Sequence, residues 1–357
     1  MSRNKFGTFF MLRALCYHRI NNFNYLRFLF LEVCKLHFKK MYRMKIKQHY
    51  IIPLFLLLIL LTACTTKSNN TKNSKNQLNI GVMSSMDYLP LAVAQENGFF
   101  KKEGVNITIH KFYSANERDA AFQSENLDGT ILDYTGAAIQ LAGGVKLKIT
   151  SQCDGTFVLI AGKDSGVKSV NDLEGKHLAV SRNTVIDFCT DLVLQKAGIG
   201  LDDIEKVEIN KIPLRLEMLR NGKIDATMLP DPFATLALQD GNRSIIDIRE
   251  LDLHVTGIAF HEKVIEQNPK TINSFYRAYN QAVVLLNSEP ANSFHSILIS
   301  DIGIPAELVS QIKLPNYSMA QLPKERDLEK VEHWLKTKNL VSSDFDISTL
   351  ISSDLIP

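Results

Sequence analysis

The sequence predicts an α/β protein with two lobes, and three observations lead to this fold class. Short runs of aliphatic and β-branched residues alternate with longer stretches of helical spacing from Leu78 onward. The alternation occurs in two successive series, and a mostly helical stretch follows at residues 271–340. Strands that alternate with helices are typical of a largely parallel sheet covered by helices, so two series indicate two such lobes.

The first series holds strands and helices in regular alternation. Short apolar or period-two runs place the strands at residues 78–83, 106–110, 129–132, 146–150 and 157–161. The helices are expected at residues 89–100, 116–124 and 135–141. Pro90 is typical of a first helical turn, and Gly143 with Gly144 is typical of a helix end.

The second series repeats the pattern. Its expected strands are residues 177–180, 206–209, 226–229, 244–248 and 255–260, and its expected helices are 170–173, 184–197, 214–221 and 232–238. Gly175, Gly198 and Gly241 follow three of these helices, as glycine commonly does at a helix C-terminus. The helical tail is divided by four prolines, Pro290, Pro305, Pro315 and Pro323.

An export signal is predicted upstream of the fold. The apolar run from Ile51 to Ala63 has 13 residues and follows a basic stretch, whereas a membrane-spanning helix needs roughly 20 residues. A basic flank, a short apolar core and small residues before a cleavage site are typical of a secretory signal peptide. The alternative is a membrane anchor with a chance cysteine.

The end of this signal predicts a lipid anchor. The sequence LTAC at residues 61–64 resembles the bacterial lipobox. That resemblance implies cleavage before Cys64, a diacylglyceryl group on its thiol, and a protein held at the extracytoplasmic face of the cell membrane. Residues 41–63 would then be the signal peptide, and residues 64–77, which are almost entirely polar, a flexible tether.

Residues 1–40 are basic and aromatic without a clear period, and they precede a signal that is complete from Met41 or Met44. We expect an upstream start codon chosen in error; the alternative is a true extension from Met1. Either way these residues are left out of the predicted fold.

Charge excludes one class of partner. The chain has 41 basic and 38 acidic residues. Residues 1–64 contain eleven Lys or Arg and one acid, Glu32, so the remaining 293 residues carry a net charge of −7. Nucleic-acid binding requires a basic surface, so we expect no nucleic-acid partner.

Cysteine use points away from metal chemistry. Apart from the predicted lipid site Cys64, only Cys153 and Cys189 remain past the predicted cleavage site. They can form a disulfide in an exported protein, or they are small buried residues. No Cys-x-x-Cys and no Cys/His cluster with zinc spacing occurs, so we expect no metal and no cofactor.

The candidate site lies in the loops that follow the predicted strands, because open α/β sheets bind ligands at the carboxyl ends of their strands. Aromatic residues there would form walls and polar residues would contact the ligand. A helix start after residue 183 would also offer N–H groups to an anion. The predicted ligand-binding residues are Asp87, Tyr88, Asp133, Tyr134, Thr135, Asp154, Phe157, Arg182, Asn183, Thr184, Asp231 and Phe233.

Each of these residues also has a purely structural interpretation. Asp133, Thr184 and Asp231 are good helix N-caps, because short polar side chains satisfy the free N–H groups of a first turn. Tyr88 and Phe233 suit a core, and Asp154 before a glycine suits a turn. The functional interpretation depends on all the loops meeting at one edge of the two sheets.

Four segments carry a family resemblance. Residues 88–105, YLPLAVAQENGFFKKEGV, resemble the opening of the nitrate, sulfonate, taurine and thiamine-precursor group of ABC-importer substrate-binding proteins. Residues 169–176, SVNDLEGK, look like that family's entry into its second lobe. Residues 219–226, LRNGKIDA, and residues 229–232, LPDP, look like its later landmarks.

The resemblance implies a type 2 periplasmic-binding-protein fold with the ligand cleft between the lobes. One lobe would hold residues 78–160 and 252–357, the other residues 161–251. Closure of the lobes around a small molecule would present both of them to an ABC importer permease. We expect a monomer.

The loop charges bear on the ligand. The candidate loops contain four aspartates and one arginine, Arg182, and uncompensated carboxylates disfavour a small anion. A neutral or amine-bearing ring compound, such as a pyrimidine thiamine precursor, is therefore expected. A sulfonate, nitrate or taurine receptor is the alternative.

Two other functions are weighed against the receptor. Some enzymes of pyrimidine and menaquinone biosynthesis resemble this fold, but the cysteine-rich iron motif of the yeast pyrimidine enzymes is absent, and no catalytic set stands out. We therefore expect that the chain is not an enzyme. A surface lipoprotein that adheres to host or wall material would not need a polar and aromatic cleft.

Overall fold

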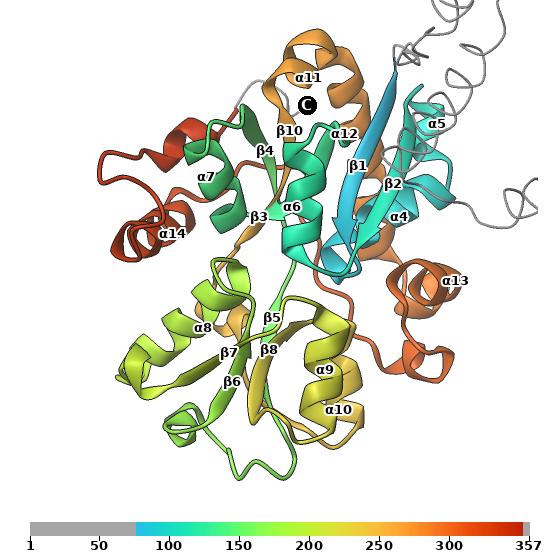
Figure 1. The fold of residues 1–357 in the computed structure, drawn as a ribbon. Helices are drawn as coiled ribbons and strands as arrows, with labels where there is room; N and C mark the ends of the chain where they lie inside the picture. Colours follow the sequence, from blue (N-terminus) through green and yellow to red (C-terminus); the bar gives the residue numbers. More distant parts are fainter. Residues whose placement is uncertain (1–75, 353–357) are drawn as a thin grey trace, which may run out of the picture. The chain divides into compact units, whose positions relative to one another are not determined.

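The computed structural model describes residues 76–352. Cys64, the predicted signal peptide and almost all of the predicted tether lie outside the described residues. Within them the chain forms two five-stranded sheets, with strand orders β2-β1-β3-β10-β4 and β7-β6-β8-β5-β9. Figure 1 shows one sheet above the other, each covered by its own helices. This is the α/β, two-lobed architecture that the alternation predicts.

The first sheet is mixed. Its strands are β1 (Gln77–Met83), β2 (Asn106–Phe112), β3 (Gly129–Asp133), β4 (Leu147–Cys153) and β10 (Thr256–His261). Strand β1 runs parallel to β2 and β3, whereas β10 runs antiparallel to β3 and β4. The antiparallel strand is the one that returns from the second lobe, so its direction follows from the chain's path.

The second sheet has the same plan. Its strands are β5 (Phe157–Ala161), β6 (His177–Val180), β7 (Glu205–Glu208), β8 (Ala226–Pro230) and β9 (Arg243–Asp247). Strand β6 pairs parallel with β7 and β8, and β5 pairs antiparallel with β8 and β9. The expected first lobe, ending at residue 160, therefore runs too far, because β5 is hydrogen-bonded into the second sheet.

Helices cover both sheets at nearly the expected positions. Those before β5 are α4 (Leu89–Glu96), α5 (Phe99–Lys102), α6 (Ala115–Gln123) and α7 (Tyr134–Ala142). The second lobe has α8 (Val185–Lys196), α9 (Ile212–Arg220) and α10 (Phe233–Gln239). The single helix expected at 89–100 is two helices, because Gly98 lies between them with a φ of 70°.

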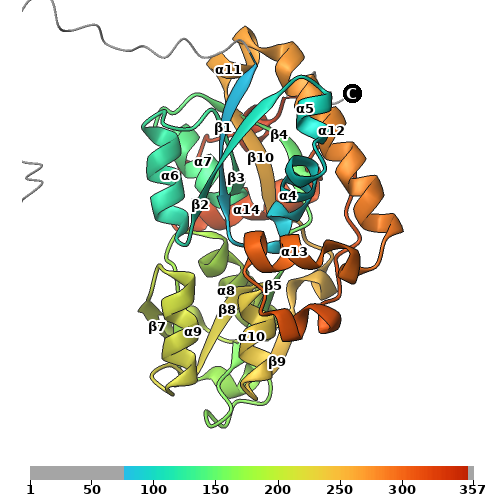
Figure 2. The same ribbon diagram turned by 90° about the vertical axis from the view of Figure 1, so that its right-hand side faces the viewer.

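The tail returns to the first lobe. It contains α11 (Glu262–Gln267), α12 (Pro269–Ser288), α13 (His295–Ile297) and α14 (Glu325–Thr337). Phe275, Tyr276 and Tyr279 of α12 are buried in the core that β1 and α4 share. Leu328, Val331 and Leu335 of α14 are buried in the core that contains α7. Figure 2 shows α12 along one side of the first sheet and α13 below it.

Two stretches of chain connect the lobes. The first, residues 154–156, joins β4 to β5, and the second, residues 248–255, joins β9 to β10. Between residues 76 and 352, no helix has the length and apolar character needed to cross a membrane. Cys153 and Cys189 are both free and buried, so the disulfide interpretation was wrong and the buried one is confirmed.

Candidate functional site

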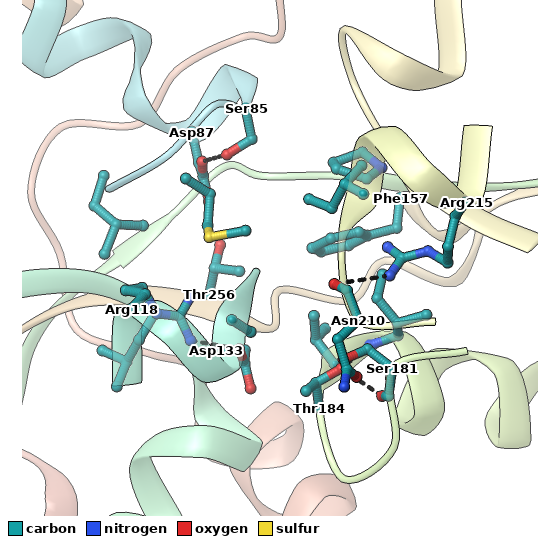
Figure 3. Close-up of a pocket in the computed structure, with 18 residues that line it drawn as sticks. Ser85, Asp87, Arg118, Asp133, Phe157, Ser181, Thr184, Asn210, Arg215 and Thr256 are labelled. Atoms are coloured by element: carbon teal, nitrogen blue, oxygen red, sulfur yellow. Dashed lines mark hydrogen bonds and ion pairs between the residues drawn. The ribbon is translucent and has the colours of Figure 1, made fainter. Parts of the chain in front are cut away.

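A pocket lies between the two sheets, near the connecting stretches. It is lined from the first lobe by Met83, Ser85, Asp87, Ala115, Arg118, Ile131, Leu132, Asp133 and Thr256, and from the second by Phe157, Ser181, Thr184, Val185, Ile186, Asn210, Ile212, Arg215 and Pro230. Figure 3 shows the labelled side chains of the two lobes facing each other across the pocket. A ligand there would touch both lobes.

The pocket is small. The cavity volume, counted as the space open to the centre of a water-sized sphere, is about 40 Å³. A single water molecule needs roughly 10 to 15 Å³ of such volume. In this conformation the space suits a compact polar group of a few atoms.

Arg215 provides a cation without a counter-ion on the second-lobe wall. Its side chain lies on α9 and the residue is 1 % exposed. Nη1 donates to the backbone oxygens of Ile209, at 2.9 Å, and Asn210, at 3.4 Å. Among residues 76–352, Nε and Nη2 have no hydrogen-bond partner. No carboxylate in that range forms an ion pair with this guanidinium.

Burial makes the Arg215 cation costly, yet it keeps its charge. Loss of hydration lowers the pKa of the guanidinium to about 10, which leaves it protonated at neutral pH. A buried charge that lacks a partner is unfavourable unless an opposite charge arrives. The lining position of Arg215 therefore points to an anionic ligand group.

The start of α8 adds hydrogen-bonding groups to the same wall. Thr184 caps the helix, accepting from the Ile186 N–H at 3.3 Å and donating to the Ser181 backbone oxygen at 2.8 Å. The Ser181 hydroxyl donates to Asn210 Oδ1 at 2.9 Å. Because a helix N-terminus carries partial positive charge, this end of α8 favours an anion as well.

Arg118 on the first-lobe wall is already neutralised. Its guanidinium lies 2.7 Å from Asp119 Oδ1 and 2.9 Å from Asp133 Oδ2. Burial opposes its charge, but the two carboxylates outweigh burial and raise its pKa. Burial also raises the pKa of Asp119, to about 6. For Asp133, Arg118, Thr135 and the Gly136 N–H together outweigh burial and lower the carboxyl pKa.

Asp87 is the other charged group of the first-lobe wall. It is 6 % exposed and accepts a short hydrogen bond from Ser85 Oγ. Burial raises the pKa of its carboxyl, with Ser85 and the more distant Arg118 opposing. Across residues 76–352 it has no ion pair. A cationic group on a ligand would therefore find an acceptor here.

The structure brings four of the predicted site residues to the pocket: Asp87, Asp133, Phe157 and Thr184. Asp133 and Thr184 are also the N-caps of α7 and α8. These two residues therefore have the capping role that the structural interpretation predicts, and they also line the pocket.

The other eight predicted residues lie elsewhere, and the aromatic ones are in the cores. Tyr88 and Tyr134 are buried in the cores of the first lobe. Phe233 is buried in a core of the second lobe. Thr135 donates to Asp133 Oδ1 and does not line the pocket.

The remaining four predicted residues have protein partners. Asp154 accepts from the Ser318 N–H at 2.7 Å. Asp231 accepts from the Thr235 N–H at 3.0 Å, in the first turn of α10. Asn183 has a φ of 60°, and its backbone N–H donates to the Asp187 carboxylate. The exposed Arg182 donates to the Lys206 backbone oxygen.

Sequence reasoning missed the two arginines, because only loops after strands were searched. Ile212, Leu216 and Leu219 form the buried stripe of α9, and Arg215 lies on the same face. Arg118 likewise shares the buried face of α6 with Phe122. A cation within an apolar helix stripe was the available signal. Ser85, Ser181 and Asn210 lie in loops that follow predicted strands but were not selected, and Thr256 lies inside a predicted strand.

Comparison with known proteins agrees with this fold. Residues 85–293, more than half of the chain, match the family described as "NMT1/THI5 like", and the chain belongs to that family. It is 25 % identical over 245 residues to a Bacillus subtilis (strain 168) protein named "Putative aliphatic sulfonates-binding protein", covering 66 % of this chain and 73 % of the relative.

Solved structures share the two-lobed fold. The periplasmic aliphatic sulphonate binding protein SsuA from Escherichia coli superposes with a TM-score of 0.67 at 19 % identity, over 78 % of this chain and 98 % of SsuA. The periplasmic nitrate-binding protein NrtA from Synechocystis PCC 6803 gives 0.67 at 13 % identity, over 77 % and 84 %.

The family model thus shows the family, and the solved structures show the two-lobed fold of periplasmic binding proteins. The family resemblance and the periplasmic-binding fold predicted from the sequence are confirmed. The relatives named above are binding proteins, in agreement with the expectation that the chain is not an enzyme.

Proposed function

We propose that this protein is a lipid-anchored receptor that binds a small organic anion between its lobes and delivers it to an ABC importer permease. The observation that carries the ligand class is Arg215, a buried cation with two unpaired N–H-bearing nitrogens at the pocket wall. The start of α8 adds partial positive charge beside it, whereas the Ser181 and Thr184 hydroxyls already donate to protein oxygens. Charge-assisted hydrogen bonds from such a cation to an anion are among the strongest in proteins.

The sulfonate group is the anion that we favour. The Bacillus subtilis relative is named for aliphatic sulfonates and the Escherichia coli structure for an aliphatic sulphonate. The pocket has room for a compact head group, and apolar side chains beside it, such as Met83, Ile131 and Ile212, suit a short alkyl chain.

The ligand expected from the loop charges rests on a premise that the structure contradicts. Three of the four aspartates are compensated, because Asp133 pairs with Arg118 while Asp154 and Asp231 accept hydrogen bonds from backbone N–H groups. Asp87 accepts only from the Ser85 hydroxyl. Of the aromatic residues expected to stack on a pyrimidine ring, Phe157 alone lines the pocket. The pyrimidine receptor thus has less support than the anion receptor.

An amine on the ligand is a second possibility that one residue favours. Asp87 is buried, lines the pocket and lacks an ion-pair partner among the described residues, so an ammonium group would compensate its charge. An anion that also carries an amine would satisfy Arg215 and Asp87 together.

A thermal-shift panel tests the ligand class. Protein that lacks residues 1–63 and carries Cys64→Ser would be melted with ethanesulfonate, 2-aminoethanesulfonate, nitrate and 4-amino-5-hydroxymethyl-2-methylpyrimidine. A ligand that binds the folded state raises the melting temperature by mass action, about 2.7 kcal/mol of stabilisation at a hundred times Kd. We expect a rise with the sulfonates. A rise with the pyrimidine alone would contradict the proposal.

The lipid anchor is tested separately. Cells that express the full chain would be treated with an inhibitor of lipoprotein signal peptidase. We expect a larger form to accumulate, and Cys64→Ser to give that form without inhibitor. Equal migration under all conditions would rule out lipidation at Cys64.

A further inference from the structure

A buried charge cluster ties the tail helix α14 to the second lobe. Asp187 and Asp191 of α8 are 1 % and 0 % exposed. Lys206 of β7 contacts both carboxylates, at 2.6 Å from Asp187. Lys338, at the C-terminal end of α14, reaches the same two carboxylates at 3.0 and 3.1 Å. Each aspartate therefore shares a lysine from its own lobe and one from the tail.

The tryptophan of α14 reinforces this contact. Trp334 Nε1 donates to Asp191 Oδ2 at 2.9 Å. Its ring meets Phe188 of α8 edge-on with centroids 5.6 Å apart. Lys338 Nζ lies 4.8 Å from the centre of the same ring. Polar and apolar contacts thus act together at one end of α14.

The middle of α14 packs into a core that both lobes share. Leu328, Val331 and Leu335 are buried there with residues of α7 and of α8. Asp327, in its first turn, accepts from the His254 N–H at 3.1 Å, in the second connecting stretch. The helix therefore reaches from the second connecting stretch to α8. Figure 1 shows it beside α7.

The cluster continues into the ligand pocket. The Asn183 N–H donates to Asp187 Oδ2 at 3.2 Å, the oxygen that Lys338 also contacts. Asn183 holds a left-handed φ of 60°, which is unusual for a residue with a side chain. Its neighbours Ser181 and Thr184 both line the pocket.

From this chain of contacts we infer that Lys338 is a positioning residue for ligand binding: through Asp187 it holds residues 181–184 in the conformation that presents Ser181, Thr184 and the start of α8 to the ligand. The inference rests on the proposed function. It also makes α14 a further tie between the lobes, in addition to the two connecting stretches, and gives the tail a role in the receptor.

Removal of Lys338 has a definite consequence. Burial opposes charge at Asp187, but Lys206 and Lys338 outweigh it and lower the carboxyl pKa. Without Lys338, Lys206 alone faces the two buried carboxylates. The repulsion between these carboxylates then strains α8 and the hydrogen bond from the Asn183 N–H to Asp187. Residues 181–184 then sample more conformations, so ligand binding must first order them.

The test compares three variants of the full chain in detergent. Lys338→Met removes the charge and keeps most of the aliphatic stem, and Lys338→Arg restores a cation. Lys336→Met is the matched control, because Lys336 pairs with Glu332 on its own helix. Calorimetric titration with ethanesulfonate measures affinity, and hydrogen–deuterium exchange of the ligand-free protein measures opening of residues 181–187.

We expect Lys338→Met to weaken ethanesulfonate binding about 5- to 30-fold and to speed exchange at residues 181–187. The affinity of Lys338→Arg for ethanesulfonate should stay within about threefold of the wild-type affinity. Lys336→Met should bind ethanesulfonate as the wild type does. Wild-type affinity or unchanged exchange in folded Lys338→Met would overturn the inference. Trp334→Phe, which removes the N–H donor to Asp191 and part of the ring, serves in its place if Lys338→Met does not fold.

The two proposals fail separately. If the wild type binds neither ethanesulfonate nor another organic anion, the proposed function fails, whereas the exchange measurement still decides whether Lys338 positions residues 181–184. If the wild type binds ethanesulfonate and Lys338→Met binds it equally well, only the positioning role is lost.

Discussion

Arg118 and Arg215 show how one residue type takes different roles in one pocket. Both guanidiniums are buried and both line the site. Arg118 forms ion pairs with Asp119 and Asp133, so its charge is balanced inside the first lobe. Arg215 has only backbone oxygens around Nη1, so its charge is available to a ligand. The presence or absence of carboxylate partners therefore decides which of the two arginines can bind an anionic ligand.

Asp87 is expected to set a preference between ligands. In the wild type, an ammonium group placed near this carboxylate forms a charge-assisted contact, so 2-aminoethanesulfonate should bind at least tenfold tighter than propanesulfonate, which has a similar size. Asp87→Asn should reduce that ratio to about threefold or less. Titration of both ligands into both proteins measures it.

The control for Asp87 is the plain sulfonate itself. Propanesulfonate should bind Asp87→Asn at least as well as the wild type, because a carboxylate that faces an anion has been removed. A wild type that prefers propanesulfonate would contradict the role of Asp87, while leaving anion recognition by Arg215 intact.

At the scale of elements, local signals predicted most strands and helices and long-range pairing decided the rest. Alternation and glycine positions gave β1, β6 and α8 nearly to the residue. They could not show that β5 joins the second sheet, because that depends on hydrogen bonds to β8 and β9. The site residues divide in the same way. Local sequence signals predicted helix caps such as Asp133, whereas Arg215 lines the pocket because of how α9 packs on the second sheet.

The first connecting stretch is close-packed against the site. A Cβ at Gly155 would lie 2.8 Å from Asp87 Oδ2 and 3.0 Å from Thr256 Oγ1. Gly155→Ala should therefore displace Asp87 and cost about 1 to 3 kcal/mol through overpacking. A fall of several degrees in melting temperature and a weaker preference for the amine-bearing sulfonate are the expected results.

Gly162→Ala is the matched control for Gly155→Ala. Its added Cβ would come no closer than 3.5 Å to another atom, which is ordinary contact. It should melt within about two degrees of the wild type. Equal melting temperatures and equal ligand preferences in the two variants would show that the connecting stretch adjusts to the added methyl group and does not constrain Asp87.

At the scale of the whole molecule, the connection between the lobes holds a charged histidine. His254 Nε2 lies 3.6 Å from Asp154 and Nδ1 lies 3.7 Å from Asp327, so residues from the first connection, the second connection and α14 meet there. The carboxylates of Asp154 and then Asp327 raise the imidazole pKa to about 9, against burial and the nearby Lys324.

This raised pKa predicts the direction of the pH dependence of stability. Folded protein holds the His254 proton more tightly than unfolded protein, so the stabilisation is complete below pH 6.5 and is lost as the pH rises through about 9. The side chain is 24 % exposed, so solvent screening reduces the loss to about 1 to 2 kcal/mol.

Unfolding of the wild type and of His254→Gln between pH 6 and pH 10 measures this contribution. The free energy of unfolding of the wild type should fall more steeply above pH 7 than that of the variant, and the two curves should converge near pH 10. Parallel curves over the whole range would show that His254 does not couple to folding.

The central claim is that an organic anion binds between the lobes on Arg215, and calorimetric titration of ethanesulfonate tests it most directly. Arg215→Met should bind at least about 30-fold more weakly than the wild type, yet melt at the same or a higher temperature, because a buried unpaired charge is removed. Arg220→Met, which changes an exposed arginine on the same helix, should bind as the wild type does. Unchanged affinity in Arg215→Met, or a wild type that binds no organic anion, would contradict the account.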